Sequence, residues 1–235
     1  MKNDRVRDLN RFYSILDRLS RLHCGPRTLA NCTGRSEWPV RGVYFFQEPG
    51  EERRDTGSGP RIVRVGTHAL TASSKTTLWN RLSQHKGVSR TGGGNHRGSI
   101  FRLLVGTATI VKNNLSYPTW GQGSTASRST RDEEIPLEVK VSASIRSMPF
   151  LWLSITDESG PDSLRGYIEQ NAIALLSNFN RTPLDPPSEN WLGHFCQREK
   201  VRRSGLWNQR HVDQEYAPQF LNALESAVEK MGADQ

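Results

Sequence analysis

The sequence predicts a mixed α/β (α+β) fold, in which a small mixed β-sheet is flanked by helices and helical extensions lie at both ends of the chain. Three observations lead to this fold class. Two strand-like runs, residues 41–47 and 61–66, are joined by a loop rich in glycine, proline and charge. Segments with helical periodicity stand before and after these runs. A short apolar run at 149–155 has the length of a buried strand.

The first segment, residues 4–22, carries apolar side chains at helical spacing with arginines between them. This pattern predicts an amphipathic helix with an arginine-rich outer face. Gly25 and Pro26 end the helix, and a turn-rich linker follows. We therefore interpret residues 1–37 as an N-terminal helix and linker.

The segments after the hairpin are less regular. Residues 75–86 have an apolar stripe that predicts a helix, with Ser73 or Ser74 as its candidate N-cap. Alternation over residues 99–111 predicts a third strand. The polar, glycine- and serine-rich stretch at about 112–135 is typical of an insertion in a loop.

A short helix over 137–147 is expected before the apolar strand. Two more helices follow, one starting near Pro161 and one spanning about 218–231. The predicted order is therefore β-β-α-β-(α)-β-α. We expect residues 38–182 to form the core and residues 183–235 to form a C-terminal extension that packs against it.

Composition limits the class of partner. The net charge is +8 at pH 7, and the basic residues are spread along the chain. A basic folded surface favours a polyanion such as nucleic acid, because each cation placed on a phosphate releases condensed counterions. Solubility alone is the alternative. No apolar run follows Met1 and the three cysteines form no CxxC pair, so we expect a cytoplasmic protein with reduced thiols and no signal peptide or membrane anchor.

Two helical segments carry side chains suited to chemistry. Arg81 and His85 stand four residues apart on one helix face, where a guanidinium can neutralise a phosphoryl oxygen and an imidazole can accept a proton. Glu169 lies among apolar neighbours, so its carboxylate must be paired, hydrogen-bonded or bound to an oxygen-preferring ion such as Mg²⁺. A solvated polar face and a structural salt bridge are the respective alternatives.

Taken in order, these residues resemble the motifs of the GIY-YIG nuclease family. Gly42-Val43-Tyr44 is similar to the first signature, Val65-Gly66 ends the strand of the second, and an arginine helix and a glutamate helix follow. The likeness covers roughly residues 38–181, and His85 is similar to the added histidine of restriction endonucleases within the family. It implies these catalytic residues: Tyr44, Arg81, His85, Glu169 and Asn180.

The resemblance also implies how these residues act. Glu169 would hold Mg²⁺ or Mn²⁺, which polarises the scissile phosphate. Tyr44, with its proton drawn off by His85, would activate a water, and Arg81 would stabilise charge on the phosphoryl oxygens. Asn180 would position its neighbours by hydrogen bonding.

The chain departs from the family at one position. Arg64 stands where the family has its second tyrosine, two residues before the glycine. Arg64 or His68 is therefore the candidate substitute for that tyrosine. A weakened or silent site is the alternative.

Two further stretches are candidates for DNA contact. A triple glycine precedes Asn95, His96 and Arg97, which predicts a DNA-contact or lid loop, with an ordinary mobile loop as the alternative. Residues 198–211 combine basic side chains with a tryptophan that we expect to be exposed. Its candidate DNA-binding residues are Arg202, Arg203, Trp207 and Asn208. The alternative is that Leu206 and Trp207 dock the C-terminal segment onto the core.

The sequence thus predicts a metal-dependent endonuclease that hydrolyses DNA, in the manner of a restriction or defence nuclease. Double-stranded DNA is the expected partner, a homodimer would allow both strands to be cut, and no membrane is involved. A structure- or single-strand-selective repair nuclease, or an RNase, is the second hypothesis. A catalytically silent nucleic-acid-binding module is the third.

Overall fold

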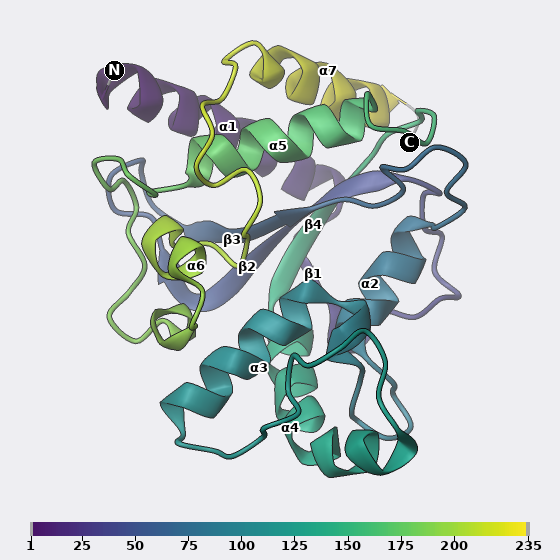
Figure 1. Cartoon of the computed structure of the whole chain (residues 1–235). Coiled ribbons are helices and arrows are strands. Elements are labelled where there is room, and N and C mark those ends of the chain that lie inside the picture. The colour runs from purple at the N-terminus through teal and green to yellow at the C-terminus, as the bar shows by residue number, and fades with distance from the viewer. Residues whose placement is uncertain (1, 234–235) are drawn as a thin grey trace.

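A four-stranded sheet with helices on both faces organises the chain (Figure 1), confirming the predicted mixed α+β class. The computed structural model describes residues 2–233. The strand order is β1-β4-β2-β3, and all three pairings are antiparallel. The strands are β1 (Arg27–Thr28), β2 (Gly42–Glu52), β3 (Pro60–Gly66) and β4 (Pro149–Ser154).

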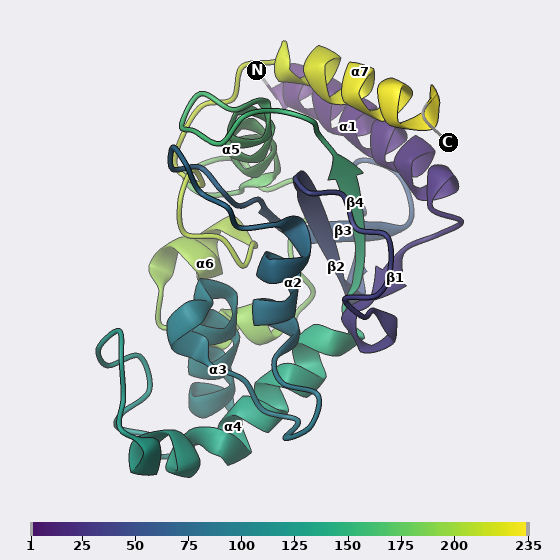
Figure 2. The ribbon, with the colours of Figure 1, turned by 90° about the vertical axis from the view of Figure 1, so that its right-hand side faces the viewer.

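The helices form one layer on each side of the sheet. Their bounds are α1 (Lys2–Leu22), α2 (Leu78–Lys86), α3 (Ile100–Lys112), α4 (Arg128–Ser147), α5 (Leu164–Leu176), α6 (Glu199–Ser204) and α7 (Phe220–Ala233). Short 3₁₀ turns are η1 (Leu29–Asn31), η2 (His96–Gly98) and η3 (Leu192–Phe195). Figures 1 and 2 show α1, α5 and α7 on one face of the sheet and α2, α3, α4 and α6 towards the other. No described helix is long and apolar enough to cross a bilayer.

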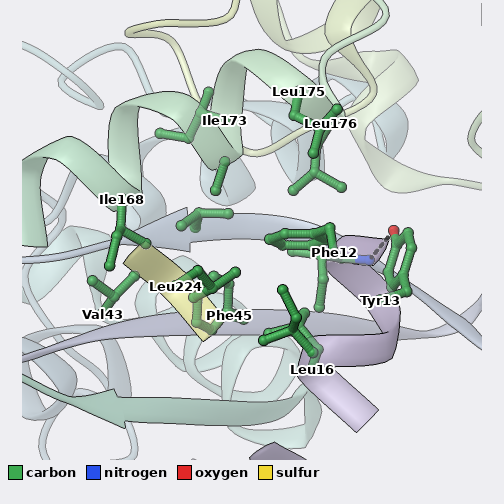
Figure 3. Close-up of a cluster of buried hydrophobic side chains, with 14 of the residues drawn as sticks. Phe12, Tyr13, Leu16, Val43, Phe45, Ile168, Ile173, Leu175, Leu176 and Leu224 are labelled. Carbon is green, nitrogen blue, oxygen red and sulfur yellow. Dashed lines mark hydrogen bonds between the residues drawn. The ribbon is translucent and has the colours of Figure 1, made fainter. Parts of the chain in front are cut away.

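Alternation along β2 divides the core into two clusters, because neighbouring side chains point to opposite faces of a sheet. Val43 and Phe45 pack against helices α1, α5 and α7, where Phe12 is also fully buried (Figure 3). Tyr44 and Phe46 face the opposite cluster, together with α2, α3 and α4. The two clusters therefore fix which side of the sheet the Tyr44 side chain can reach.

The strand predicted over residues 99–111 is wrong, because this segment forms helix α3. Phe101, Leu104, Val105 and Ala108 are buried at helical spacing, and Ser99 caps the helix by accepting from the backbone N–H of Arg102. The same apolar residues also fit a partial alternation, which is how a short apolar run imitates a strand.

Helix α4 is longer than the predicted 137–147 and takes up part of the proposed insertion. Pro136 lies inside it, and a proline is normally read as a helix boundary.

The capping prediction for α2 is wrong. Thr77, not Ser73 or Ser74, caps α2, accepting from Asn80 N at 3.1 Å while Asn80 Oδ1 accepts from Thr77 N at 3.0 Å.

Candidate active site

A cavity of about 600 Å³ opens where the C-terminal end of β3 meets α2 and α5. Four of the candidate catalytic residues, counting the possible substitute Arg64, line it: Tyr44, Arg64, Arg81 and Glu169. They come from two strands and two helices. The two that are farthest apart in the chain, Tyr44 and Glu169, are separated by 125 positions. The fold thus brings together three of the five predicted catalytic side chains and the arginine that replaces the family tyrosine.

Tyr44 depends on a glycine on the neighbouring strand. It pairs with Gly66 across the β2–β3 ladder. A Cβ atom at position 66 would lie 2.3 Å from the Tyr44 hydroxyl oxygen, closer than any non-bonded contact allows. Gly66 is therefore needed to leave room for the tyrosine ring, which is itself fully buried.

A chain of hydrogen bonds starts at the Tyr44 hydroxyl. Tyr44 Oη lies 2.8 Å from Nε2 of His85, and His85 Nδ1 lies 2.8 Å from Ser99 Oγ. Burial lowers the pKa of His85 well below its usual value, and the positive charges of Arg81, Arg64 and Arg102 lower it further. A neutral imidazole has one donor and one acceptor nitrogen, so His85 can accept the tyrosine proton.

His85 differs from the expectation in its burial. The sequence places Arg81 and His85 on a polar helix face, but His85 is fully buried beneath Tyr44 while Arg81 lines the cavity. Arg81 Nη1 donates to Gln84 Oε1 at 3.0 Å and to the carbonyl oxygen of Gly98 at 3.2 Å. These contacts hold the guanidinium at the rim.

Arg64 is buried beside Tyr44. Its Nη1 donates to the carbonyl oxygen of Trp207, its guanidinium stands 4.7 Å from the Phe101 ring centre, and its buried Nε has no partner among the described residues. Burial lowers the pKa of Arg64, an effect that nearby Tyr44 and Glu169 oppose. Arg64 therefore places a positive charge on the floor of the cavity, in addition to that of Arg81 at the rim.

Glu169 is the one carboxylate among the cavity-lining residues of the described chain. Its Oε1 accepts from the backbone N–H of Thr67 at 3.1 Å, and no described residue donates a hydrogen bond to Oε2 or forms a salt bridge with it. Burial raises the pKa of Glu169, while the charges of Arg64 and His211 act in the opposite direction. One oxygen of a half-buried carboxylate is thus available to a ligand.

Two predicted site residues lie elsewhere. Asn180 follows α5 in a left-handed conformation (φ 55°), and its Oδ1 accepts from Arg203 instead of facing the cavity. His68 Nε2 contacts the carbonyl oxygen of Val40 at 3.3 Å, and burial lowers the pKa of this histidine to about 4. Neither residue lines the cavity.

The loop expected to contact DNA or act as a lid is tied to the body of the protein. Asn95 caps a 3₁₀ turn by accepting from Arg97 N at 3.0 Å, and Arg97 forms a bidentate ion pair with Glu134 at 2.6 and 2.9 Å. His96 is buried, with Nδ1 3.0 Å from Glu138 Oε1. The side chains of His96 and Arg97 are therefore engaged in structural contacts.

The expected exposure of Trp207 is wrong, because the ring is fully buried. Its Nε1 donates to Glu48 Oε2 at 2.9 Å, and Trp191 Nε1 donates to the same oxygen at 3.0 Å. The indole thus docks the C-terminal segment onto the core, as in the alternative reading. Arg202 donates to the carbonyl oxygen of Cys196 at 2.6 Å, and Arg203 donates to Glu199 Oε1 at 2.8 Å.

The segment around Asn208, a candidate DNA-binding residue, forms a wall of the cavity, a position that the sequence analysis does not predict. Asn208 donates from Nδ2 to the carbonyl oxygen of Val65 at 2.8 Å and accepts from Val65 N at 3.2 Å. The next three side chains, Gln209, Arg210 and His211, line the cavity. Their basic stretch is visible in the sequence, but its attachment to the edge of β3 has no local signal.

No group of three or more histidine, cysteine, aspartate or glutamate side chains that could hold a metal ion occurs within residues 2–233. Any ion at the cavity would therefore need ligands from water or substrate in addition to Glu169, as Mg²⁺ commonly has.

Comparison with known proteins gives one match. A family model described as the GIY-YIG domain matches residues 3–234, which is nearly the whole chain. Searches found no matching curated protein and no matching solved structure.

Proposed function

The chain belongs to the GIY-YIG nuclease family, and from this premise we propose that it is a metal-dependent endonuclease that hydrolyses phosphodiester bonds of double-stranded DNA. One observation carries the proposal: the Tyr44–His85–Ser99 hydrogen-bond chain begins at a cavity that Arg81 and Glu169 also line. A proton acceptor, cationic groups and a free carboxylate oxygen are the parts that phosphodiester hydrolysis requires.

The first step is activation of water by Tyr44. Burial leaves the imidazole of His85 neutral, so that Nε2 is the acceptor towards which the phenolic proton moves, and Ser99 Oγ orients the ring from Nδ1. The tyrosine oxygen then accepts a proton from the attacking water. A bond forms between the water oxygen and phosphorus as the bond to the leaving 3′-oxygen breaks.

Two arginines stabilise the charge that builds up on the phosphate. Arg81 at the rim and Arg64 on the floor both present guanidinium groups to the cavity. Cationic donors that are already in place lower the barrier, because no reorganisation is needed when the charge develops. We assign to Arg64 a phosphate-binding role in place of the family tyrosine.

Glu169 would hold Mg²⁺ or Mn²⁺ through Oε2, the carboxylate oxygen that no described residue contacts. Such an ion supplies Lewis-acid stabilisation of the phosphate and of the leaving oxygen. The carboxylate fits this role because it is half-buried, supplies a hard oxygen ligand and has no protein partner at that oxygen among the described residues.

We further propose a restriction or defence role. The histidine one helical turn after the arginine is similar to that of restriction endonucleases in the family, and the net charge of +8 suits a DNA substrate. Homodimerisation is the simplest way for one such site per chain to cut both strands.

The decisive test is cleavage of supercoiled plasmid with Mg²⁺ or Mn²⁺ by the wild type, Glu169→Ala and Arg81→Ala. Matched controls are Glu189→Ala and Arg128→Ala, which change exposed side chains away from the cavity. We expect the two site variants to lose at least 100-fold activity and the controls to keep it. An inert wild type, or full activity in Glu169→Ala, would refute the proposal. Parallel single-stranded DNA and RNA substrates would reveal a different nucleic-acid preference.

A further inference from the structure

The segment from Asn208 to Val212 is fixed at both ends. At one end the Asn208 amide makes two hydrogen bonds to the backbone of Val65. At the other end Val212 is fully buried, and its carbonyl oxygen accepts from Ser177 Oγ at 2.6 Å. The three side chains between these anchors are therefore presented to the cavity by a rigid piece of backbone.

His211 is held in an unusual conformation within this segment. Its φ is +64°, a left-handed value that is uncommon outside glycine, although histidine, like asparagine and aspartate, adopts it more readily than other residues. Such strain persists only where the surrounding contacts impose it, and it is common at functional sites. The anchors on either side supply that constraint.

One ring nitrogen of His211 has a protein partner. Nδ1 lies 2.8 Å from Gln214 Oε1, which is a carbonyl-type acceptor, so Nδ1 is the donor and carries a hydrogen. No described residue hydrogen-bonds to Nε2. This is how a metal-binding histidine is usually prepared, with the far nitrogen fixing the ring and its tautomer while the near nitrogen binds the ion.

His211 shares the cavity with Glu169, whose Oε2 has no hydrogen-bond donor among the described residues. Two side chains that each leave one ligand atom without a protein partner thus line the same space.

We propose that His211 is, through Nε2, a second protein ligand of the divalent ion held by Glu169. The inference rests on the proposed function and adds a nitrogen donor to an oxygen site. Imidazole suits transition metals better than it suits Mg²⁺, so the site should bind Mn²⁺ more tightly than Mg²⁺. Water and phosphate oxygens complete the coordination.

The test is direct spectroscopy of bound Mn²⁺ on the full chain. Free Mn²⁺ measured by electron paramagnetic resonance gives the affinity, and electron spin echo modulation reveals ¹⁴N coupling from a ligating imidazole. Asparagine tolerates left-handed backbone, so His211→Asn removes the ligand with little added strain. We expect His211→Asn to lose the ¹⁴N signal and to bind Mn²⁺ at least tenfold more weakly. His194→Ala, an exposed histidine outside the cavity, should match the wild type in both measurements.

His211→Asp provides a second variant that also suits the backbone. It exchanges the nitrogen donor for oxygen, so the ¹⁴N signal should disappear while binding persists and preference moves from Mn²⁺ towards Mg²⁺. An unchanged ¹⁴N signal in His211→Asn, or no such signal in a wild type that binds Mn²⁺ and cleaves DNA, overturns this inference alone. A wild type that neither binds Mn²⁺ nor cleaves refutes the proposed function itself.

Discussion

At the scale of single residues, the site depends on one hydroxyl group in the apolar first half of strand β2. Tyr44 is fully buried, yet its oxygen meets both His85 and the cavity. The ring contributes to the core and the hydroxyl contributes to the chemistry. These two contributions can be separated by a substitution that removes the oxygen atom alone.

We expect Tyr44→Phe to lower kcat by about 10²–10⁴-fold, the range for loss of a general base, and to cost about 1–3 kcal/mol of stability through the lost hydrogen bond to His85. Tyr13→Phe is the matched control, because the Tyr13 hydroxyl accepts from the backbone N–H of Ile62 far from the cavity. That variant should lose about 1 kcal/mol of stability and keep its activity. Plasmid cleavage and thermal unfolding measure the two effects. Equal activity of Tyr44→Phe and the wild type would exclude the proposed proton transfer from Tyr44 to His85.

At the scale of elements, the position of the C-terminal segment depends on a buried carboxylate. Glu48 on β2 accepts from the indole N–H groups of both Trp191 and Trp207. Burial raises the pKa of Glu48, an effect the two indole hydrogen bonds oppose. The same segment continues into the cavity wall at residues 208–211. A contact outside the cavity thereby determines the geometry inside it.

Glu48→Ala should leave two buried indole donors without acceptors and cost about 2–4 kcal/mol of unfolding free energy. We also expect a red shift in tryptophan fluorescence and weaker DNA binding, because the segment that forms the cavity wall is held less firmly against the core. Glu48→Gln keeps an acceptor oxygen and should behave more like the wild type. Denaturant unfolding and fluorescence test this. Loss of DNA binding in Glu48→Ala with no change in stability or emission would contradict the coupling.

At the scale of the whole molecule, burial of neutral histidines ties stability to pH. His23, His68 and His85 all have pKa values lowered chiefly by burial. Each binds a proton more readily when the chain is unfolded, where the pKa is about 6.5. Below that pH the unfolded state gains protons first, so stability must fall as the solution becomes acidic.

His68 gives the measurable window, from about pH 6.5 down to its folded pKa of about 4. It should account for up to about 3 kcal/mol lost across that interval. His68→Gln keeps a donor for the Val40 carbonyl oxygen and cannot titrate. Urea unfolding between pH 7.5 and 4.5 should show a shallower loss for the variant than for the wild type. Parallel curves would show that His68 does not contribute.

Across the whole molecule, some features of the site could be predicted from the sequence and others could not. The order of Tyr44, Arg81 and Glu169 along the chain was enough to predict a shared site, because each belongs to a short motif on a recognisable element. The burial of His85 and its contact with Ser99 were not predictable, since Ser99 was assigned to a strand. The wall at His211 depends on the pairing of the Asn208 side chain with Val65 on an edge strand, 143 positions away, for which no local pattern exists.

The late position of that wall in the chain has a consequence for biosynthesis. The ribosome makes the tyrosine, arginine and glutamate of the cavity before it makes Asn208, whose amide closes the edge of β3. Helix α7, which packs against α1, is made later still. A nascent chain therefore carries an unfinished cleft until residues 208–211 have been translated and have reached the edge of β3. A cell making this nuclease meets the finished cleft only after that segment has been added to the other three sides.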